Sequence, residues 1–443
     1  MEKRYTLPVA IALVVGTVIG SGVFFKAEAV LVKTGGNMGI GILAFLIMGV
    51  VMIISACTFG LVAQSHEDVE GLVGYARASC GRTYGYYVGW FMAVIYYPSL
   101  VSVLSWLPAR YFGVLLGWED AVIGGRTMML AGFFMIVTYT MNALAPRLAG
   151  KFAVGTTTIK LIPLLLMAVV GTIVGLRSGM TQANFSHVVT QIPFSQALFG
   201  AVVSLAFAFE GWICATSIGP ELENSKKNMP RALLIGTVIV AVVYVIYYAG
   251  LAGAVDSAVL MESGETGAKL AFQKIFGQVG GTAVFVFVVI SCWGTCNGLT
   301  MAVTRGMYDL ANESGSPRLA MFKTVDPASG MAVNSAVFGL LSSVLWLIYF
   351  YFGTILNSFG PLMFDSSELP IITLYALYIP IYIALMKRRD LSLFRRRVMP
   401  LLAIACSCFM VFAAIYAHRW NVAWYLGLFV IIEAVGACFK GKA

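Results

Sequence analysis

Charged residues are scarce in this chain of 443 residues: they make up 11% of it, whereas hydrophobic residues make up 60% and the mean hydropathy is +0.88. A soluble domain of this length could not bury so much apolar surface. The scarcity of charge therefore excludes a soluble globular protein and predicts a chain that crosses a membrane several times. No cleavable signal pattern is present, because the first apolar run is too long for one.

Motifs for metal or nucleotide binding are also missing. The eight cysteines show neither CxxC spacing nor pairing with histidine, so we interpret them as small hydrophobic residues. The three histidines, His66, His187 and His418, fall in loops or at the ends of apolar runs, where none is placed as a proton relay. No Walker A sequence occurs, which argues against an ATP-driven pump. We therefore expect no cofactor and no bound metal.

Apolar runs of about 20 residues, long enough to cross the hydrocarbon core as helices, recur along the chain. The first and the sixth are interrupted by small and polar residues. A short amphipathic helix is expected at the membrane surface over 66–82, and a helical cap over 256–278. The sequence thus predicts an all-α membrane protein with twelve spans: 6–33, 39–63, 83–109, 124–143, 150–176, 195–224, 229–255, 279–311, 331–353, 366–386, 397–417 and 420–439.

The net charge of +9 comes from Lys and Arg residues that we place in the short loops between these runs. Most of them fall in the loops of one side; the other side holds few, among them Lys26 and Arg110. Under the positive-inside rule this asymmetry places both termini in the cytoplasm, and an even number of spans agrees. We expect a multi-pass protein of the cell membrane that contacts membrane lipids, and no nucleic acid partner.

The first apolar run contains GTVIGSGVFF, from Gly16 to Phe25, with Gly20, Ser21 and Gly22 at its middle. Glycine destabilises a helix by about 1 kcal/mol relative to alanine. Because an unpaired backbone amide is unfavourable in lipid, a helix breaks there only where it lines a cavity or binds something. We expect a break at this cluster. The second half of the helix then presents N–H groups at its positive end, which is a seat for a carboxylate.

A second interruption lies in LAFAFEGWICATSIGPELENSKKNMPRAL, residues 205–233. Each interruption falls in the first helix of a five-helix unit, 6–176 or 195–386. Since five is odd, the second unit enters the membrane from the opposite side. Interrupted helices at corresponding positions of inverted halves indicate the binding site of a secondary transporter.

Three stretches carry a family resemblance. GTVIGSGVF resembles the first-helix motif of the amino acid-polyamine-organocation (APC) superfamily, and EGLVGYARASCGRTYGYYVGW and FAFEGW...PELENSKKNMPRAL are similar to its later motifs. The similarity is greatest to the L-type amino acid transporters and their bacterial relatives, which share Phe-Ala-aromatic-x-Gly-Trp. The resemblance implies a single domain of the LeuT type, with inverted repeats over 6–176 and 195–386 and two extra helices over 397–439.

The resemblance also implies a set of site residues. The substrate carboxylate is expected at Gly20, Ser21 and Gly22, and Phe207 is similar to the family's aromatic gate. Helix packing through small residues is the alternative for the glycines, and plain packing for Phe207. The expected substrate-binding residues are Val18, Ile19, Gly20, Ser21, Gly22, Ala206, Phe207, Ala208, Phe209 and Glu210.

Glu210 departs from the L-type pattern, which has a small residue at this place. A carboxylate near mid-bilayer costs about 2.5–3.5 kcal/mol on insertion scales and is functional by default. Glu210 can bind a cationic substrate, take up a proton or pair with another buried charge. A carboxylate held by backbone amides of the broken helix is the structural alternative.

Two further residues are expected to couple transport to an ion. Lys160 is a lone cation in the fifth run, and its position resembles the family lysine that takes the place of a sodium ion, which argues against sodium coupling. The alternative is a side chain that snorkels to the headgroups. Tyr244 is expected to face Lys160 or the first break, with Tyr247 and Tyr248 as competitors.

These features predict a sodium-independent secondary transporter of L-amino acids that works by alternating access, as exchanger or proton symporter, and not an enzyme. Phe207 and Phe209 favour a small or medium neutral substrate, whereas Glu210 leaves a cationic amino acid or a polyamine open. A channel would need repeated filter loops or charged rings and is the remote alternative. Residues 110–124 contain no cysteine for a disulfide-linked partner, so no obligatory protein partner is expected.

Overall fold

The computed structural model describes residues 5–66, 69, 71–263, 266–327 and 330–441. Every element in these ranges is a helix, apart from one isolated bridge between Tyr5 and Leu222. Within the ranges, 11 helices are long and apolar enough to cross a membrane; α1 (Leu7–Val18) and α2 (Gly22–Lys33), bent by 40° at their break, make the count 12 when taken as one span. The prediction of an all-α protein with twelve spans is confirmed.

Tertiary contacts divide the chain into two compact units. The first is made of Met1–Gly85, Leu161–Phe285 and Ile371–Ala417, and the second of Tyr86–Lys160, Val286–Pro370 and His418–Ala443. Each unit therefore takes helices from both of the predicted repeats. All the residues expected to bind substrate belong to the first unit, whereas Lys160 belongs to the second.

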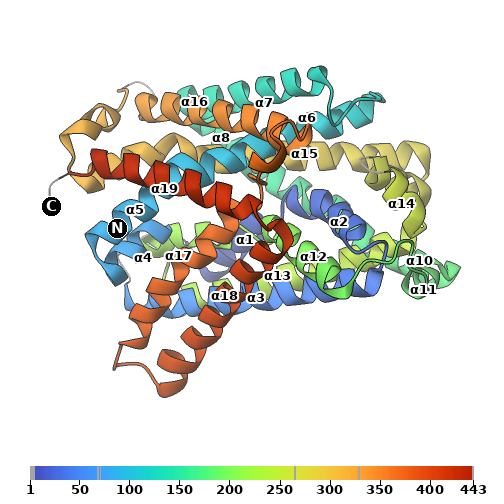
Figure 1. Cartoon of the computed structure of the whole chain (residues 1–443), viewed down its shortest axis with the longest axis horizontal. Coiled ribbons are helices and arrows are strands. Elements are labelled where there is room, and N and C mark those ends of the chain that lie inside the picture. The colour runs from blue at the N-terminus through green and yellow to red at the C-terminus, as the bar shows by residue number, and fades with distance from the viewer. Residues whose placement is uncertain (1–4, 67–68, 70, 264–265, 328–329, 442–443) are drawn as a thin grey trace. The chain divides into compact units, whose positions relative to one another are not determined.

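The first unit contains both interrupted spans. α3 (Met38–Ser65) begins at Asn37, whose side chain accepts a hydrogen bond from the Ile40 N–H at 3.0 Å. α13 (Ser225–Ala254) lies along α3 and also packs on α1, while α12 (Phe194–Ala208) packs on α2 (Figure 1). The other elements that lie mainly in this unit are α4 (Gly71–Cys80), α9 (Leu161–Leu166), η2 (Met167–Gly171), α10 (Thr172–Ser178), α11 (Met180–Ser186), η3 (Trp212–Glu221), α14 (Ser257–Ser263), α17 (Leu369–Met386), η8 (Phe394–Val398) and α18 (Met399–His418).

In the second unit, α6 (Tyr97–Leu116), α7 (Gly125–Leu144) and α16 (Val333–Tyr349) pack on one another (Figure 1). Two buried asparagines join further helices: Asn142 Nδ2 on α7 donates to Asn297 Oδ1 at 2.9 Å, and Asn297 Nδ2 donates to the Ala149 carbonyl at 3.0 Å. The remaining elements are α5 (Arg82–Phe91), η1 (Met92–Tyr96), α8 (Pro146–Ile159), α15 (Gly267–Ser314, which starts in the first unit), η5 (Pro317–Lys323), η6 (Phe350–Ile355), η7 (Gly360–Leu362) and α19 (Asn421–Phe439).

Two basic residues that were counted with the loops lie inside helices: Lys26 within the predicted first span, 6–33, and Arg110 just beyond the predicted end of the third. Lys26 is part of α2 and is 3% exposed. Arg110 is part of α6 and is 1% exposed, because the third span continues to Leu116 rather than ending at residue 109. The Arg110 guanidinium lies 5.0 Å from the ring of Trp106 and 5.2 Å from that of Tyr111. Such aromatic faces attract a buried cation. The loop placement of these two residues was wrong.

The two helical segments expected outside the spans are confirmed. α4 forms within 66–82, and α14 with the first part of α15 forms within 256–278, where a break at Gly277 has a φ of 73°. Residues 67–68, 70 and 264–265 of these segments lie outside the described ranges. All eight cysteines are free, with Cys292 and Cys296 buried and Cys408 and Cys438 exposed.

Candidate functional site

The first predicted break is present at its expected position. α1 ends at Val18 and α2 begins at Gly22; between them the Ile19 backbone is extended, and its N–H still donates to the Val15 carbonyl at 2.8 Å. Ser21 is fully buried, its hydroxyl has no hydrogen-bond partner in the described part of the chain, and no side chain caps α2. The positive end of α2 therefore presents backbone N–H groups and one hydroxyl at the break.

The second break lies between Ala208, the end of α12, and Trp212, where η3 begins. Gly211 has a φ of 104°, a conformation that favours glycine. A Cβ atom on Gly211 would lie 2.7 Å from the Thr17 carbonyl oxygen, and one on Gly22 would lie 2.8 Å from the Ala208 Cα. The backbones of the two broken spans are thus in direct contact at both breaks, and glycine at these positions permits the contact.

Tyr244 of α13 connects the two breaks. Its buried hydroxyl shares its one proton between the Val18 carbonyl at 3.0 Å and the Ala208 carbonyl at 3.2 Å, and it accepts a hydrogen bond from the Gly20 N–H. Val18 and Ala208 are the last residues of their helices, where carbonyls lack partners within the helix. One side chain therefore satisfies both helix ends and fixes the geometry of the crossing.

The two competing tyrosines have other surroundings. Tyr247 makes an edge contact with Phe24, at 5.5 Å between ring centroids, and Tyr248 packs on Phe45 at 4.8 Å. Tyr244 is therefore the tyrosine that faces the first break, as expected.

Phe207 and Phe209 are placed differently, although they are two residues apart. Phe207 lies at the end of α12, and the Lys26 Nζ atom is 5.6 Å from the centre of its ring. Phe209 is fully buried, with its ring 5.1 Å from that of Tyr244 and 6.0 Å from that of Phe45. Phe207 therefore fits a gate position better than Phe209, whose ring fills the core.

Lys26 is a further candidate site residue that sequence reasoning missed. It lies four residues after Gly22, and this spacing places both on one face of α2. The signal was available in the sequence, because the predicted first span, 6–33, already contains Lys26. Its ammonium group adds positive charge beside Phe207 in the first unit.

Glu210 occupies the second break itself and is 7% exposed. Its carboxylate lies close enough to the hydroxyls of Tyr375 and Tyr378 on α17, and to the Cys214 thiol, to act on each of them electrostatically. The structure thus places the carboxylate beside α17.

Lys160 lies in the second unit, at the turn between α8 and α9. Its N–H donates to the Thr156 carbonyl at 3.0 Å, and its side chain is 5% exposed. A lysine that snorkels to the headgroups would keep its stem on the protein surface. Burial excludes that alternative and leaves a cation held inside the protein.

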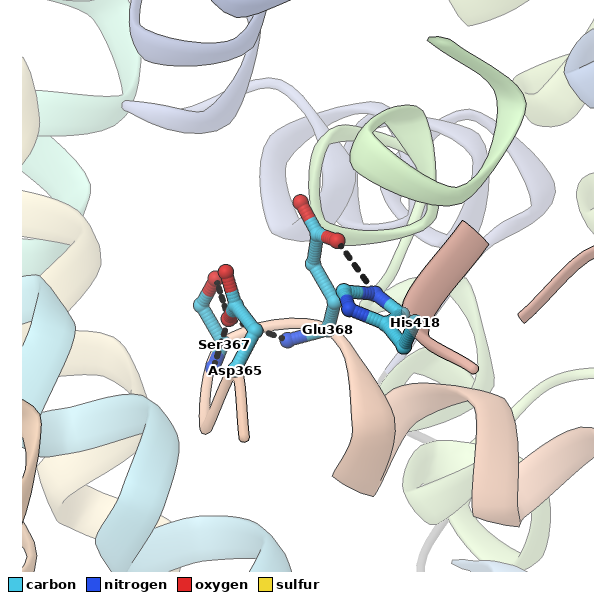
Figure 2. Close-up of polar contacts among 4 residues, drawn as sticks. All are labelled: Asp365, Ser367, Glu368 and His418. Atoms are coloured by element: carbon cyan, nitrogen blue, oxygen red, sulfur yellow. Dashed lines mark hydrogen bonds and ion pairs between the residues drawn. The ribbon is translucent and has the colours of Figure 1, made fainter. Parts of the chain in front are cut away.

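A buried ion pair in the second unit was also missed (Figure 2). His418 Nε2 lies 3.1 Å from Glu368 Oε2, with side chains 16% and 7% exposed. Asp365 Oδ1 accepts hydrogen bonds from the Ser367 N–H at 2.7 Å, the Ser367 hydroxyl at 2.6 Å and the Glu368 N–H at 3.1 Å, and so holds Glu368 in place. The pair joins residues 50 positions apart, which no local pattern reveals.

We expect His418→Ala to lower the thermal unfolding temperature of the detergent-solubilised protein by a few degrees. A hydrogen bond to a charged group contributes about 1.5–3 kcal/mol when buried. The exposed His187 offers the matched control, because His187→Ala removes an imidazole from the surface. Equal unfolding temperatures for the two variants would contradict a stabilising role for the ion pair.

A small, partly open pocket is lined by Phe24, Glu28, Leu31, Tyr247, Leu251 and Leu260 among others. It touches none of the residues expected to bind substrate. Within the described ranges, no three His, Cys, Asp or Glu side chains are grouped to hold a metal ion.

Comparison with known proteins bears on nearly the whole chain. The family model described as amino acid permease matches residues 6–434. The chain is 26% identical to the serine/threonine exchanger SteT of Bacillus subtilis, over 98% of this chain and 95% of that protein. It is 23% identical to the human cystine/glutamate transporter, over 72% of this chain and 63% of that protein, and 23% identical to the rat b(0,+)-type amino acid transporter 1, over 81% and 73%.

The matched region contains both breaks and the tyrosine that joins them. The relatives are transporters and not enzymes, as expected. The resemblance to the APC superfamily is confirmed: this chain belongs to the amino acid permease family of membrane transporters.

Proposed function

We propose that this chain exchanges small or medium neutral L-amino acids across the cell membrane by alternating access, without sodium. The observation that carries the proposal is the crossing of two broken spans, tied by Tyr244, with the buried Ser21 hydroxyl at the start of α2. A free amino acid offers a carboxylate and an ammonium group. The crossing offers backbone N–H groups at one helix start and carbonyls at two helix ends.

In this proposal the carboxylate binds at the Gly20–Gly22 cluster, through the N–H groups of Ser21 and Gly22 and the Ser21 hydroxyl, since the Gly20 N–H already donates to Tyr244. The Val18 and Ala208 carbonyls already accept from Tyr244, so the neighbouring carbonyls of Ile19 and Ala206 are the first candidates for the ammonium group. Phe207 covers the bound amino acid as a gate.

Two placements favour a neutral substrate. Glu210 lies beside the tyrosines of α17, and the Lys26 ammonium next to Phe207 would repel a cationic side chain. SteT is named for serine and threonine, which are neutral amino acids, and this agrees with a neutral substrate. The alternative is a cationic amino acid or a polyamine, with the Glu210 carboxylate turned towards the substrate.

Exchange is supported by SteT, which is named an exchanger, and independence from sodium by the buried cation Lys160. The proposal includes the expected organisation: one domain with repeats over 6–176 and 195–386, two further helices over 397–439, and both termini in the cytoplasm. Membrane lipids surround the chain, and no obligatory protein partner is required.

Uptake into proteoliposomes tests the proposal. Vesicles loaded with unlabelled serine, or with buffer alone, receive labelled serine or labelled arginine outside, in sodium or in choline salts. We expect labelled serine to enter only the serine-loaded vesicles, at the same rate in both salts. Uptake of arginine instead would support the cationic alternative. Entry of labelled serine into buffer-filled vesicles under an inward proton gradient would indicate proton symport instead of exchange. A requirement for sodium would refute the proposal.

Tyr244→Phe should lower serine exchange by about 5- to 30-fold, the change for a loss of one or two kcal/mol. The phenylalanine ring keeps the edge contact with Phe209, but the hydroxyl that joins Val18 to Ala208 is lost. The measurement is the initial uptake rate at equal protein content.

Tyr248→Phe provides the control on the same helix. The Tyr248 hydroxyl is buried and hydrogen-bonds to the Thr34 side chain, not to a carbonyl at either break, so its removal should leave exchange unchanged. If both variants lose activity equally, the hydroxyl bridge between the two breaks does not matter for transport.

A further inference from the structure

A stripe of three tyrosines runs along α17. Tyr375, Tyr378 and Tyr382 are spaced by three and four residues, which places them on one face of the helix. All three are fully buried, and the hydroxyls of Tyr375 and Tyr378 have no hydrogen-bond partner in the described ranges. Successive ring centroids are 5.8 and 6.1 Å apart, so the stripe is continuous.

Two more buried polar groups join this stripe from other helices of the first unit. The Ser55 hydroxyl of α3 hydrogen-bonds to the Tyr382 hydroxyl. The Trp212 indole ring of η3 lies 6.1 Å from the Tyr378 ring, and its N–H has no partner among the described residues. The Phe59 ring of α3 contacts two of these aromatic rings, with its centroid 4.8 Å from that of Tyr378 and 5.6 Å from that of Trp212. We call Ser55, Trp212, Tyr375, Tyr378 and Tyr382 the tyrosine cluster.

So many unpartnered polar atoms in one place are unusual for a packed core. A buried donor without a partner is unfavourable, and native proteins carry few of them. Buried water commonly satisfies such groups where several converge. Trp212 of the cluster follows Glu210 by two residues and lies 6.1 Å from Tyr378, and the Glu210 carboxylate acts electrostatically on Tyr375 and Tyr378. A carboxylate at membrane depth is functional by default.

We propose that Glu210 is a proton-binding site and that the tyrosine cluster, together with internal water, is the path by which it gains and loses its proton. Each hydroxyl accepts a proton on one side and passes its own on the other, so the cluster returns to its starting state. The Glu210 carboxylate becomes a carboxylic acid when the proton arrives. The stripe runs along α17 towards Met386, and the exposed residues Lys387 and Arg389 follow this end of the helix. In the proposal the path meets water there.

The groups around Glu210 suit this role. Cys214 on its own element and Tyr375 and Tyr378 on α17 face the carboxylate, while Tyr382 and Cys406 of α18 face the tyrosines in turn. These thiols and phenols are neutral near pH 7. Protonation of Glu210 therefore changes the charge at the second break. An effect of protons on amino acid exchange depends on the proposed function. The proton-binding site at Glu210 does not depend on it.

An infrared pH titration of the purified, solubilised protein tests the site without any transport. We expect a carboxylic acid band that loses intensity as pH rises and is absent from Glu210→Gln. Glu433→Gln, which removes another carboxyl group from a membrane span, should keep that band. Tyr378→Phe should slow the exchange of the Glu210 proton for deuterium by at least about tenfold, as expected for loss of one group in a proton relay. Tyr248→Phe, a buried tyrosine on α13, should not.

Three results would overturn the proposal: identical carboxylic acid bands in the wild type and in Glu210→Gln, equal deuterium exchange in Tyr378→Phe and Tyr248→Phe, or a shift of the band by sodium at constant pH. The last would assign the oxygens of Glu210 and the tyrosines to a metal cation. A protein that fails to exchange serine but shows the Glu210 band refutes the proposed substrate and leaves the proton site standing.

Discussion

Gly22→Val should abolish amino acid exchange while the protein still inserts into the membrane. The first atom of any side chain at this position would lie 2.8 Å from the Ala208 Cα and 3.3 Å from the Phe207 carbonyl oxygen. Because these are backbone contacts, α2 must move away from α12. Displacement of the site by about 1 Å is enough to lower activity about 100-fold. We expect initial uptake to fall at least that far.

The loss should follow from the site and not from the fold as a whole. Gly132→Val on α7 adds the same side chain where no atom lies within 4 Å of the new Cβ, so it should retain exchange. Thermal unfolding with and without serine separates the two effects: Gly22→Val should unfold cooperatively yet gain no stability from serine. Exchange at the wild-type rate in Gly22→Val would refute a substrate site at the broken helix.

The sequence allowed the spans and both breaks to be predicted because each rests on local composition. Runs of apolar residues show where helices cross the membrane, and Gly20, Ser21 and Gly22 show where one stops. The end of a span is harder to predict: α6 continues to Leu116 because Arg110 is stabilised by Trp106 and Tyr111, and a lone arginine was taken as a loop residue.

Contacts between distant residues could not be predicted. The hydroxyl of Tyr244 meets carbonyls that are 226 and 36 residues away along the chain, and Glu368 meets His418 across 50 residues. Hydropathy contains no information on such pairs. The tyrosine stripe of α17 is the intermediate case, since its helical spacing is visible in YALYIPIY, but its burial and its neighbours are not.

Lys160→Met should lower exchange at least about tenfold and leave it equal in sodium and in choline. Methionine keeps most of the aliphatic stem that fills the interior but removes the ammonium group. The buried cation is proposed to do electrostatically what a bound ion does in sodium-dependent transporters. Loss of the ammonium group should therefore weaken the conformation that transports the amino acid. The methionine side chain adds no carboxylate ligand, so the substitution creates no sodium site.

Lys151→Met is the matched control, since Lys151 lies on the same helix, α8, and is exposed. It should exchange serine at the wild-type rate. Sodium-stimulated uptake in Lys160→Met would show that the ammonium group occupies a site that still binds the ion, which supports the electrostatic role but contradicts the expected lack of sodium dependence. Full activity of Lys160→Met in choline would refute the electrostatic role of Lys160 in transport. The buried ammonium group would then have only a structural role.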